Sequence, residues 1–182
     1  DASQIAEYEI PSIDLVIVDL YPFEQTVASG AEESAIIEKI DIGGISLIRA
    51  AAKNFNDVAI VASKGQYGIL LDILKRNGAK TTLEDRRLLA REAFAVSSGY
   101  DTAIFNYFDG GEGSTFRAAV NGSKALRYGE NPHQEAKFYA SQERVPYSLA
   151  TAKQLNGKEM SYNNIQDANA ALNIVREFKE PF

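Results

Sequence analysis

The sequence predicts an α/β fold in which helices cover a parallel sheet. Two short runs rich in β-branched and apolar residues, 13–20 and 57–62, have the composition of buried strands. The segments between them, 32–40 and 45–53, instead repeat apolar residues at helical spacing. Strands that alternate with helices are joined by crossovers, which favours parallel pairing in one sheet. Because two strands are too few for a complete sheet, we expect further strands from sequence outside this chain.

The elements around the first strand have recognisable ends. Pro22 ends this strand, because proline has no N–H for the ladder and favours an extended residue before it. The helix over 32–40 starts with acidic residues, which a helix N-terminus favours. A turn at Asp41-Ile42-Gly43-Gly44 leads into the short helix that ends at Lys53. Residues 1–9 give little signal and are expected to lead into the first strand.

A helix is expected directly after the second strand. Ser63 is a candidate N-cap for this helix, which reaches about Arg76. Asn77-Gly78 is a suitable stop signal, because glycine readily adopts the left-handed conformation that ends many helices.

The next helical pattern has a start signal and an interruption. Thr82 and Asp85 are spaced as in a capping box, which satisfies N–H groups at a helix start. The pattern continues to about Ser98. We expect Gly99 to interrupt it, and a separate aromatic-rich helix to follow over 100–108.

A domain boundary is expected after this helix. The segment 109–114 is polar, dense in glycine and without periodicity, which is typical of a linker. It is not a phosphate-binding loop, because it lacks the Gly-Lys-Ser/Thr ending and a preceding strand. Allowing 115–119 to pack on the first domain, we place the boundary near Ala119, which gives domains over 1–119 and 120–182.

The second domain begins with a different composition. Residues 126–134 form a polar segment rich in turn-forming residues, and 137–139 is a candidate strand. A helix is expected over 167–178, with three residues facing inward: Ala171, Leu172 and Val175.

The composition restricts the possible functions. With 45% hydrophobic and 24% charged residues the chain resembles soluble globular proteins, without an apolar run or leader that would suggest a membrane or secretion. A net charge of −6 provides no basic field for nucleic acid. The absence of cysteine excludes thiolate metal sites and fits the reducing cytoplasm, and one histidine argues against a zinc site.

Tyr21, Asp41 and Lys53 are the first group of candidate site residues. Each has an ordinary explanation as a residue at a core edge, in a turn or at a solvated helix end, and spacing alone favours those explanations. Open α/β sheets, however, bind ligands outside the carboxyl ends of their strands, which is where Tyr21 is expected. A straight helix would put Lys53 about 13 Å beyond Gly44. Either the chain turns before Lys53 and folds it back, or its side chain reaches the far side of a ligand.

Arg127, Tyr128 and His133 are the second group. On these residues alone, a polar loop with a hydrogen-bonded histidine is the favoured interpretation.

Four motifs together resemble one family. Leu20-Tyr21-Pro22-Phe23, Ile40-Asp41-Ile42-Gly43-Gly44 and Arg49-Ala50-Ala51-Ala52-Lys53-Asn54 resemble the IMP cyclohydrolase half of the bifunctional AICAR transformylase/IMP cyclohydrolase family. The run Arg-Tyr-Gly-Glu-Asn-Pro-His-Gln at 127–134 resembles the start of its transformylase half. The weaker likeness from Leu155-Asn156-Gly157-Lys158 onward keeps the family order, so the resemblance covers about 13 to 182.

The resemblance implies a fold and an activity for each domain. Residues 1–119 would be the C-terminal part of the cyclohydrolase domain, an incomplete methylglyoxal-synthase-like parallel sheet with helices. Residues 120–182 would start the transformylase domain, a second α/β domain of the cytidine-deaminase-like type. The enzyme would catalyse the last two steps of de novo purine biosynthesis: formyl transfer from 10-formyltetrahydrofolate to AICAR, then cyclisation of formyl-AICAR to IMP with loss of water. Since the chain starts at Asp1 rather than Met, we expect it to be an internal piece.

The resemblance also implies roles in the cyclohydrolase site. Asp41 would act as a base on the amide nitrogen, while Lys53 and Tyr21 would stabilise charge and transfer protons. Ile42, Gly43 and Gly44 would offer backbone groups to the heterocycle. Asp19 would also belong to the substrate-binding residues, and it stands where many relatives have asparagine. A carboxylate accepts but does not donate hydrogen bonds, so no donor contact from this side chain to the substrate is expected.

In the transformylase half, the resemblance implies that Arg127 binds the substrate phosphate, Tyr128 lies along the nucleotide and His133 supports the site. The Lys-His pair of the family is expected after Phe182, so this piece alone should be incomplete for both activities. No metal is implied, and only the transformylase half uses a co-substrate, 10-formyltetrahydrofolate. The implied protein is a cytoplasmic homodimer that binds purine nucleotide precursors, without nucleic acid or membrane partners.

The alternative is a non-catalytic nucleotide-sensing module on the same methylglyoxal-synthase-like fold, because fold alone does not determine function. The motif that starts at Arg127 separates the two interpretations, since a sensing module has no reason to carry it.

Overall fold

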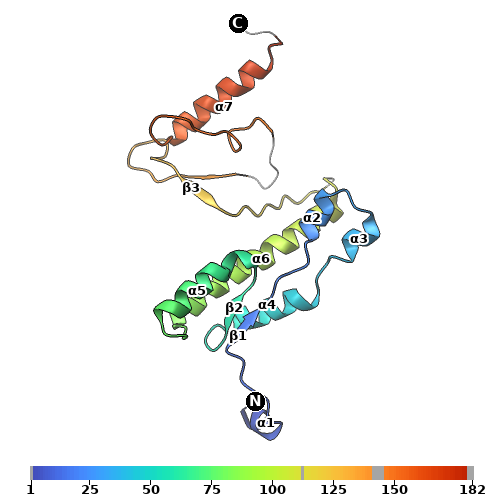
Figure 1. The fold of residues 1–182 in the computed structure, drawn as a ribbon. Coiled ribbons are helices and arrows are strands. Elements are labelled where there is room, and N and C mark those ends of the chain that lie inside the picture. Colours follow the sequence, from blue (N-terminus) through green and yellow to red (C-terminus); the bar gives the residue numbers. More distant parts are fainter. Residues whose placement is uncertain (1, 112, 141–145, 180–182) are drawn as a thin grey trace. The chain divides into compact units, whose positions relative to one another are not determined.

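A pair of parallel strands lies at the centre of the first part of the chain in the computed structural model (Figure 1). Strand β1 (Leu15–Ile17) pairs with β2 (Ala59–Val61), and Val16 is opposite Ile60. The predicted parallel pairing in one sheet is confirmed. The strands are shorter than the apolar runs that predicted them, although hydrogen bonds from Ala59 N–H to the Asp14 carbonyl and from Val18 N–H to the Val61 carbonyl extend the pairing.

The structure describes residues 2–111, 113–140 and 146–179. The chain divides into two units, Asp1–Ala119 and Val120–Phe182. Assigning these units to two catalytic domains is still a prediction. In the described ranges, no helix combines the length and the apolar character that crossing a membrane requires.

Seven helical elements belong to the described part of the first unit. They are α1 (Ala2–Glu7), α2 (Phe23–Ala28), α3 (Glu33–Ile37), α4 (Gly43–Lys53), the 3-10 turn η1 (Lys64–Gln66), α5 (Tyr67–Arg76) and α6 (Leu83–Asp109). Helices α1 and α2 are not predicted by the sequence pattern. Helix α2 starts directly after Pro22, whose restricted φ suits a helix start, and the buried side chain of Phe23 holds its first turn in the core.

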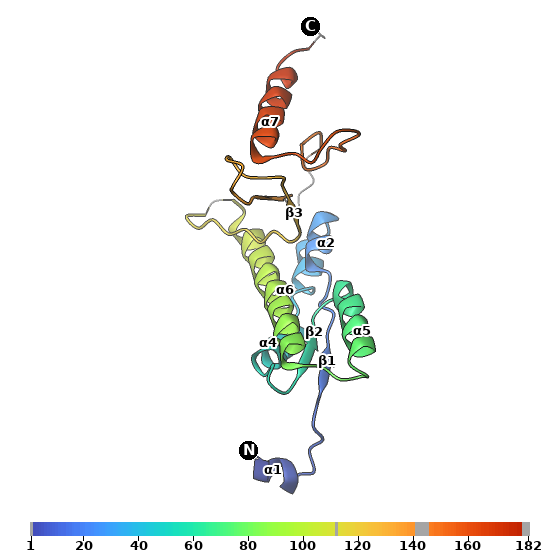
Figure 2. The ribbon, with the colours of Figure 1, turned by 90° about the vertical axis from the view of Figure 1, so that its left-hand side faces the viewer.

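The main core lies around β2. Helices α4 and α6 pack on each other and on this strand, while Figure 2 shows α5 on the other side of the strand pair. Ile48 of α4, Ile60 of β2 and Leu89 of α6 are fully buried within one cluster. Burying the strand on both sides explains why β2 reads as a continuous apolar run.

A second, smaller core joins distant parts of the first unit. It contains Phe23 of α2, Ile36 of α3 and Tyr100 of α6, all at least 93% buried. The rings of Phe23 and Tyr100 meet edge-on, with centroids 6.1 Å apart. This cluster therefore ties the segment after β1 and the segment before α4 to the same part of α6.

Helix α6 is one continuous helix through Gly99, so the predicted interruption is wrong. Glycine costs a helix interior about 1 kcal/mol relative to alanine, but Ser97 and Tyr100 on either side are buried and hold this turn in place. The helix ends where Gly110 adopts a left-handed conformation, at φ 59°. The linker predicted at 109–114 thus overlaps the helix by one residue, Asp109.

The expected helix after Ser63 consists of the 3-10 turn η1 followed by α5, and the Ser63 side chain makes no capping hydrogen bond. The predicted end at Arg76 is confirmed, with Gly78 at φ 62°. The predicted capping box is also confirmed, because Thr82 and Asp85 exchange side-chain and backbone hydrogen bonds.

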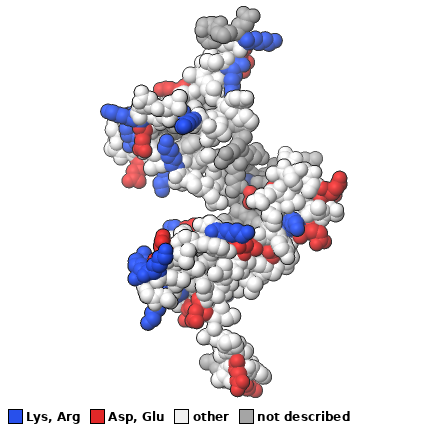
Figure 3. Space-filling model, in the orientation of Figure 1, with Lys and Arg blue, Asp and Glu red and all other residues white. Residues whose placement is uncertain are grey.

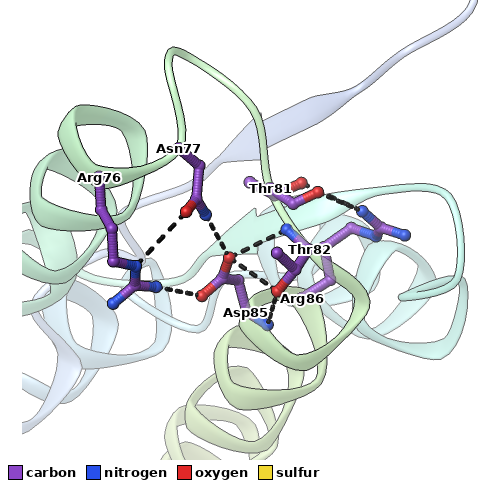
Figure 4. A network of polar contacts seen from close by, with 6 residues as sticks. All are labelled: Arg76, Asn77, Thr81, Thr82, Asp85 and Arg86. Atoms are coloured by element: carbon purple, nitrogen blue, oxygen red, sulfur yellow. Dashed lines mark hydrogen bonds and ion pairs between the residues drawn. The ribbon is translucent and has the colours of Figure 1, made fainter.

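Asp85 extends this capping box into a polar network (Figure 4). Its carboxylate accepts hydrogen bonds from the Arg76 guanidinium at 2.6 Å and the Asn77 amide at 2.7 Å, besides those from Thr82. Asp85 therefore connects the end of α5 to the start of α6 while it is itself buried. The hydrogen bond from the Thr82 backbone N–H is the first cause that lowers the pKa of Asp85 below its usual 3.8, and the Thr82 hydroxyl, Arg76 and Asn77 add to it.

We expect replacement of Asp85 by asparagine to make stability less sensitive to acid. Since the pKa of Asp85 is lower in the folded chain, the unfolded chain binds the proton more readily. Its stabilising effect is fully present above pH 3.8 and is lost as the pH falls below this value. Asp85→Asn should therefore be less stable than the parent at about pH 7, and the difference should narrow at about pH 3.

Urea unfolding at both pH values measures this difference. Glu84→Gln, which changes an exposed acid in the same first turn, is the control and should match the parent at both. A stability difference for Asp85→Asn that is equal at the two pH values would contradict the expectation.

The second unit contains a hairpin-like strand pair and one long helix. Strand β3 (Ser123–Ala125) pairs antiparallel with β4 (Lys137–Tyr139), which confirms the candidate strand. Helix α7 (Tyr162–Arg176) starts five residues earlier than predicted, because Ser161 and Asn164 form a capping box.

The predicted inward set of α7 is wrong in part. No described residue of α7 is fully buried, and Val175 is 56% exposed. Ala171 is exposed too, whereas Ile165, Ala168 and Leu172 are half-buried. Burial is confined to this stripe because little in the described part of the second unit covers the last turns of the helix.

Candidate functional site

Tyr21 lies beyond the carboxyl end of β1, where the chain turns into α2 (Figure 1). Its side chain is 57% exposed, although Phe23, two residues later, is only 1% exposed. Pro22 separates the two, and Phe23 anchors the segment while the Tyr21 ring remains accessible. This position agrees with the place where open α/β sheets bind ligands.

Asp41 and the two glycines after it form the turn that starts α4. The Gly44 N–H donates a hydrogen bond of 2.6 Å to Asp41 Oδ1. A Cβ atom on Gly44 would lie 2.7 Å from Asp41 Oδ2, so a larger residue at this position would displace the carboxylate from the helix start. A Cβ on Gly43 would instead meet open space, and Ile42 is 72% exposed. The outer side of this turn is therefore open to a ligand.

Contacts from elsewhere bring Tyr21 and this turn together. The Lys39 ammonium lies 5.5 Å from the centre of the Tyr21 ring, a cation–π distance. The Tyr100 hydroxyl accepts a hydrogen bond from Asp41 N–H and donates one to the Lys39 carbonyl, each at 2.7 Å. Burial is the first cause that raises the pKa of the Tyr100 phenol above its usual 10.0, so it remains protonated and can donate.

Sequence reasoning missed Lys39 and Tyr100. The only sequence signal for Lys39 as a site residue is its position two residues before Asp41. Tyr100 lies in an aromatic-rich segment, and nothing in the sequence connects it to a turn about 60 residues earlier.

Lys53 does not join Tyr21, Lys39, Asp41 and Tyr100. It is exposed and is the last residue of α4, which runs without interruption from Gly43. The alternative in which the chain turns before Lys53 is therefore wrong. At about 1.5 Å per residue, Lys53 is about 13 Å along the helix from Gly44, so only a long reach to the far side of a ligand remains possible.

Asp19 is also at the carboxyl end of β1, and it has a protein partner. The Tyr67 hydroxyl, at the start of α5, donates a 2.6 Å hydrogen bond to Asp19 Oδ2. This bond is the first cause that raises the pKa of Tyr67 above its usual 10.0. A carboxylate at this position thus recruits a donor from the segment after β2, and the sequence analysis had not included Tyr67 in the site.

Basic and acidic side chains of the first unit concentrate in different places (Figure 3). Basic side chains gather where α5 ends and α6 begins, and acidic ones gather around α3, where Glu32, Glu33 and Glu38 are exposed. The acidic side is the one next to the Asp41 turn in the chain. We therefore assign no phosphate contact to this turn.

The second candidate group is only partly assembled. The Arg127 guanidinium lies 4.8 Å from the centre of the Tyr128 ring and donates a 3.1 Å hydrogen bond to its hydroxyl. Two backbone hydrogen bonds, from Arg127 N–H to Met160 and from Tyr162 N–H to Tyr128, hold this pair beside the start of α7. His133 is exposed in the loop that follows and shares no hydrogen bond or ion pair with the pair among the described residues.

A cavity of about 490 Å³ lies in the same unit. Lys124, Lys153, Phe138 and Met160 are among the residues that line it, and Arg127, Tyr128 and His133 are not. This cavity and the predicted nucleotide-binding residues therefore do not coincide.

The fold and the site of the first unit define the class of the protein. It is an α/β protein with a candidate small-molecule site outside the carboxyl end of its parallel strands. A family model described as AICARFT/IMPCHase bienzyme matches residues 51–182, and the chain belongs to this family. The matched range includes Lys53 and the second candidate group, while Tyr21 and Asp41 lie before it.

Relatives named bifunctional purine biosynthesis protein PurH match nearly the whole chain. The protein from Bacteroides thetaiotaomicron is 64% identical over 180 residues, which is 99% of this chain and 34% of the relative. Those from Rhodopirellula baltica and Listeria innocua are 51% and 48% identical, and each match covers 97% of this chain and 35% or 36% of the relative. The chain thus spans about a third of the length of these relatives.

A crystal structure titled ForH is 35% identical in sequence and has a TM-score of 0.45. The match covers 59% of this chain and 56% of that one. This structural likeness is too low to bear on the fold.

Proposed function

We propose that this chain is the junction of a bifunctional enzyme that performs the last two steps of de novo purine biosynthesis. Residues 1–119 would belong to the C-terminal part of an IMP cyclohydrolase domain with a methylglyoxal-synthase-like fold. Residues 120–182 would begin the AICAR transformylase domain, of the cytidine-deaminase-like α/β type. Family membership and the names of the relatives favour this proposal over a nucleotide-sensing module, because those names describe biosynthetic proteins.

One observation supports the cyclohydrolase site in particular: Tyr21 and Asp41, 20 residues apart in sequence, are linked through Lys39. The Lys39 ammonium lies 5.5 Å from the centre of the Tyr21 ring, and the Tyr100 hydroxyl bonds both the Lys39 carbonyl and the Asp41 N–H. Asp41 Oδ1 is occupied by Gly44 N–H, whereas Oδ2 accepts no hydrogen bond among the described residues. One oxygen thus fixes the carboxylate and the other can take a proton. This is the arrangement that a general base needs.

In the proposed reaction, the carboxamide nitrogen of formyl-AICAR attacks its own formyl carbon. The C–N bond closes the ring, and the formyl oxygen leaves as water with one hydrogen from each of the two nitrogens. Asp41 takes the carboxamide proton as the bond forms. Tyr21 supplies a proton near the developing oxyanion, and Lys53 stabilises its charge from the far side of the ligand. No cofactor is needed, because the reacting groups are already tethered and only need orientation.

The other groups have supporting roles in the proposal. Ile42, Gly43 and Gly44 offer backbone groups to the heterocycle, and Asp19 with its partner Tyr67 borders the site. In the transformylase half, Arg127 binds the phosphate of AICAR, Tyr128 lies along the nucleotide and His133 supports them, with 10-formyltetrahydrofolate as co-substrate. The enzyme would act in the cytoplasm as a homodimer on purine nucleotide precursors.

A chimaera tests the proposal directly. This chain would replace the matching third of the Bacteroides thetaiotaomicron relative, to which it aligns over 180 residues. At 64% identity we expect the chimaera to retain both formyl transfer to AICAR and cyclisation of formyl-AICAR. A folded chimaera without either activity, made beside an active parent relative, would contradict the proposal.

In this chimaera, Arg127→Ala should raise the KM for AICAR roughly ten- to a hundredfold. A charge-assisted phosphate contact is worth about 1.5–3 kcal/mol and acts mainly as binding energy. Cyclisation should be unchanged, because that site belongs to the other unit. Steady-state assays of both reactions measure this, with Arg91→Ala on α6, where Arg91 is exposed and paired with its neighbour Glu92, as the control. Loss of cyclisation with formyl transfer preserved would mean that Arg127 belongs to the other site.

A further inference from the structure

We propose that Tyr100 is a positioning residue of the cyclohydrolase site: its hydroxyl holds the turn that presents Asp41 to the substrate. The inference rests on the proposed function, because it concerns the same site. It adds a residue from α6 that no motif of the sequence indicated.

The turn before α4 has little regular structure of its own. Helix α3 ends at Ile37 and α4 begins at Gly43, so the residues between them leave backbone groups without helical partners. The Tyr100 hydroxyl fills two of these vacancies at once, since it accepts from Asp41 N–H and donates to the Lys39 carbonyl. Both bonds are 2.7 Å long, and a hydroxyl can both donate and accept.

The Tyr100 ring holds the other side of the site. It is 7% exposed and packs edge-on against Phe23, which follows Tyr21 and Pro22. One side chain therefore contacts the segment of Tyr21 through its ring and the segment of Asp41 through its hydroxyl. Because the ring is fixed in a packed cluster, the hydroxyl is a rigid reference point for the Asp41 backbone.

Replacing Tyr100 by phenylalanine separates these two contributions, since it keeps the ring and removes the hydroxyl. Asp41 N–H and the Lys39 carbonyl would then lack their partner, and the turn would lose its reference point. Misplacing a catalytic group by about 1 Å can cost up to a hundredfold in rate. We expect Tyr100→Phe to lower kcat for cyclisation about tenfold or more and to leave KM within about twofold, because the turn positions a base and holds no phosphate.

Tyr107→Phe is the matched control. Tyr107 also belongs to α6 and also packs edge-on against Phe23, with ring centroids 5.8 Å apart. Its hydroxyl makes no hydrogen bond among the described residues, so its removal should leave cyclisation unchanged. The pair of variants thus compares two tyrosines in one aromatic cluster that differ in their contact with the Asp41 turn.

The experiment measures kcat and KM of both variants in the chimaera, together with hydrogen exchange in peptides that cover 38–44. The inference requires a lower kcat and faster exchange in Tyr100→Phe, with both readouts at the parent level in Tyr107→Phe. Parent-like kcat and exchange in Tyr100→Phe would overturn the inference. Equal losses of kcat in the two variants would also overturn it, because the effect would then come from ring packing. Asp41→Asn, measured in parallel, separates the two proposals. Its full activity would overturn the proposed function and this inference together, whereas an inactive Asp41→Asn beside an unaffected Tyr100→Phe overturns this inference alone.

Discussion

Cyclisation of formyl-AICAR by the chimaera is expected to fall roughly a hundredfold or more when Asp41 is replaced by asparagine, as is typical when general-base help is lost. Asparagine keeps an oxygen that can accept the hydrogen bond from Gly44 N–H, so the start of α4 should persist. What it removes is a carboxylate that can take the proton of the attacking amide nitrogen. The variant therefore tests the chemistry of Asp41 apart from its part in the turn.

The measurement is kcat for cyclisation, with circular dichroism to show that the fold is kept. Asp72→Asn provides the matched control, because Asp72 is an exposed aspartate on α5 outside the candidate site. It should leave both reactions at the parent level. If Asp41→Asn cyclises formyl-AICAR within about twofold of the parent, the general-base role is wrong.

The largest effect on stability is expected from Phe23→Ala, which should lower the free energy of unfolding by about 3–5 kcal/mol, as is usual when a buried phenylalanine is replaced by alanine. Phe23 is 1% exposed and packs edge-on against both Tyr100 and Tyr107. Such a loss is a large part of the 5–15 kcal/mol by which ordinary domains are stable. The ordering of Tyr21 should be lost with it, since Phe23 anchors that segment.

Chemical unfolding of the 182-residue chain, followed by circular dichroism, measures this loss. Phe116→Ala removes the same side chain at a position that is 93% exposed, and should change stability by less than about 0.5 kcal/mol. Equal losses for the two phenylalanines would mean that the cluster around Phe23 does not stabilise the chain.

Features that depend on neighbours in sequence could be predicted well. The parallel strands, the end of α5 at Arg76 and the capping box of Thr82 and Asp85 all follow from apolar runs, turn residues or a three-residue spacing. The turn of Asp41 to Gly44 belongs with them, because its hydrogen bond closes over three residues.

Features that depend on packing were missed or predicted wrongly. Gly99 reads as an interruption, yet the buried residues beside it keep α6 continuous. Val175 is predicted to face inward, but it is 56% exposed in the structure. The cost of glycine in a helix, about 1 kcal/mol, is outweighed where neighbouring residues are buried. An apolar residue at helical spacing is buried only where another part of the chain packs against it.

The candidate site divides along the same line. By itself the sequence determined the family, the parallel strands and the motifs that contain Tyr21, Asp41 and Arg127, because each of these features depends on residues that are adjacent in sequence. Only the tertiary structure decided which of them meet: Tyr100 reaches the Asp41 turn across 59 residues and Tyr67 reaches Asp19 across 48, whereas the rigid length of α4 keeps Lys53 apart. Hydrogen bonds between residues so far apart in sequence form only where α4, α5 and α6 pack around the strands and bring their side chains together. No pattern of neighbouring residues predicts that packing.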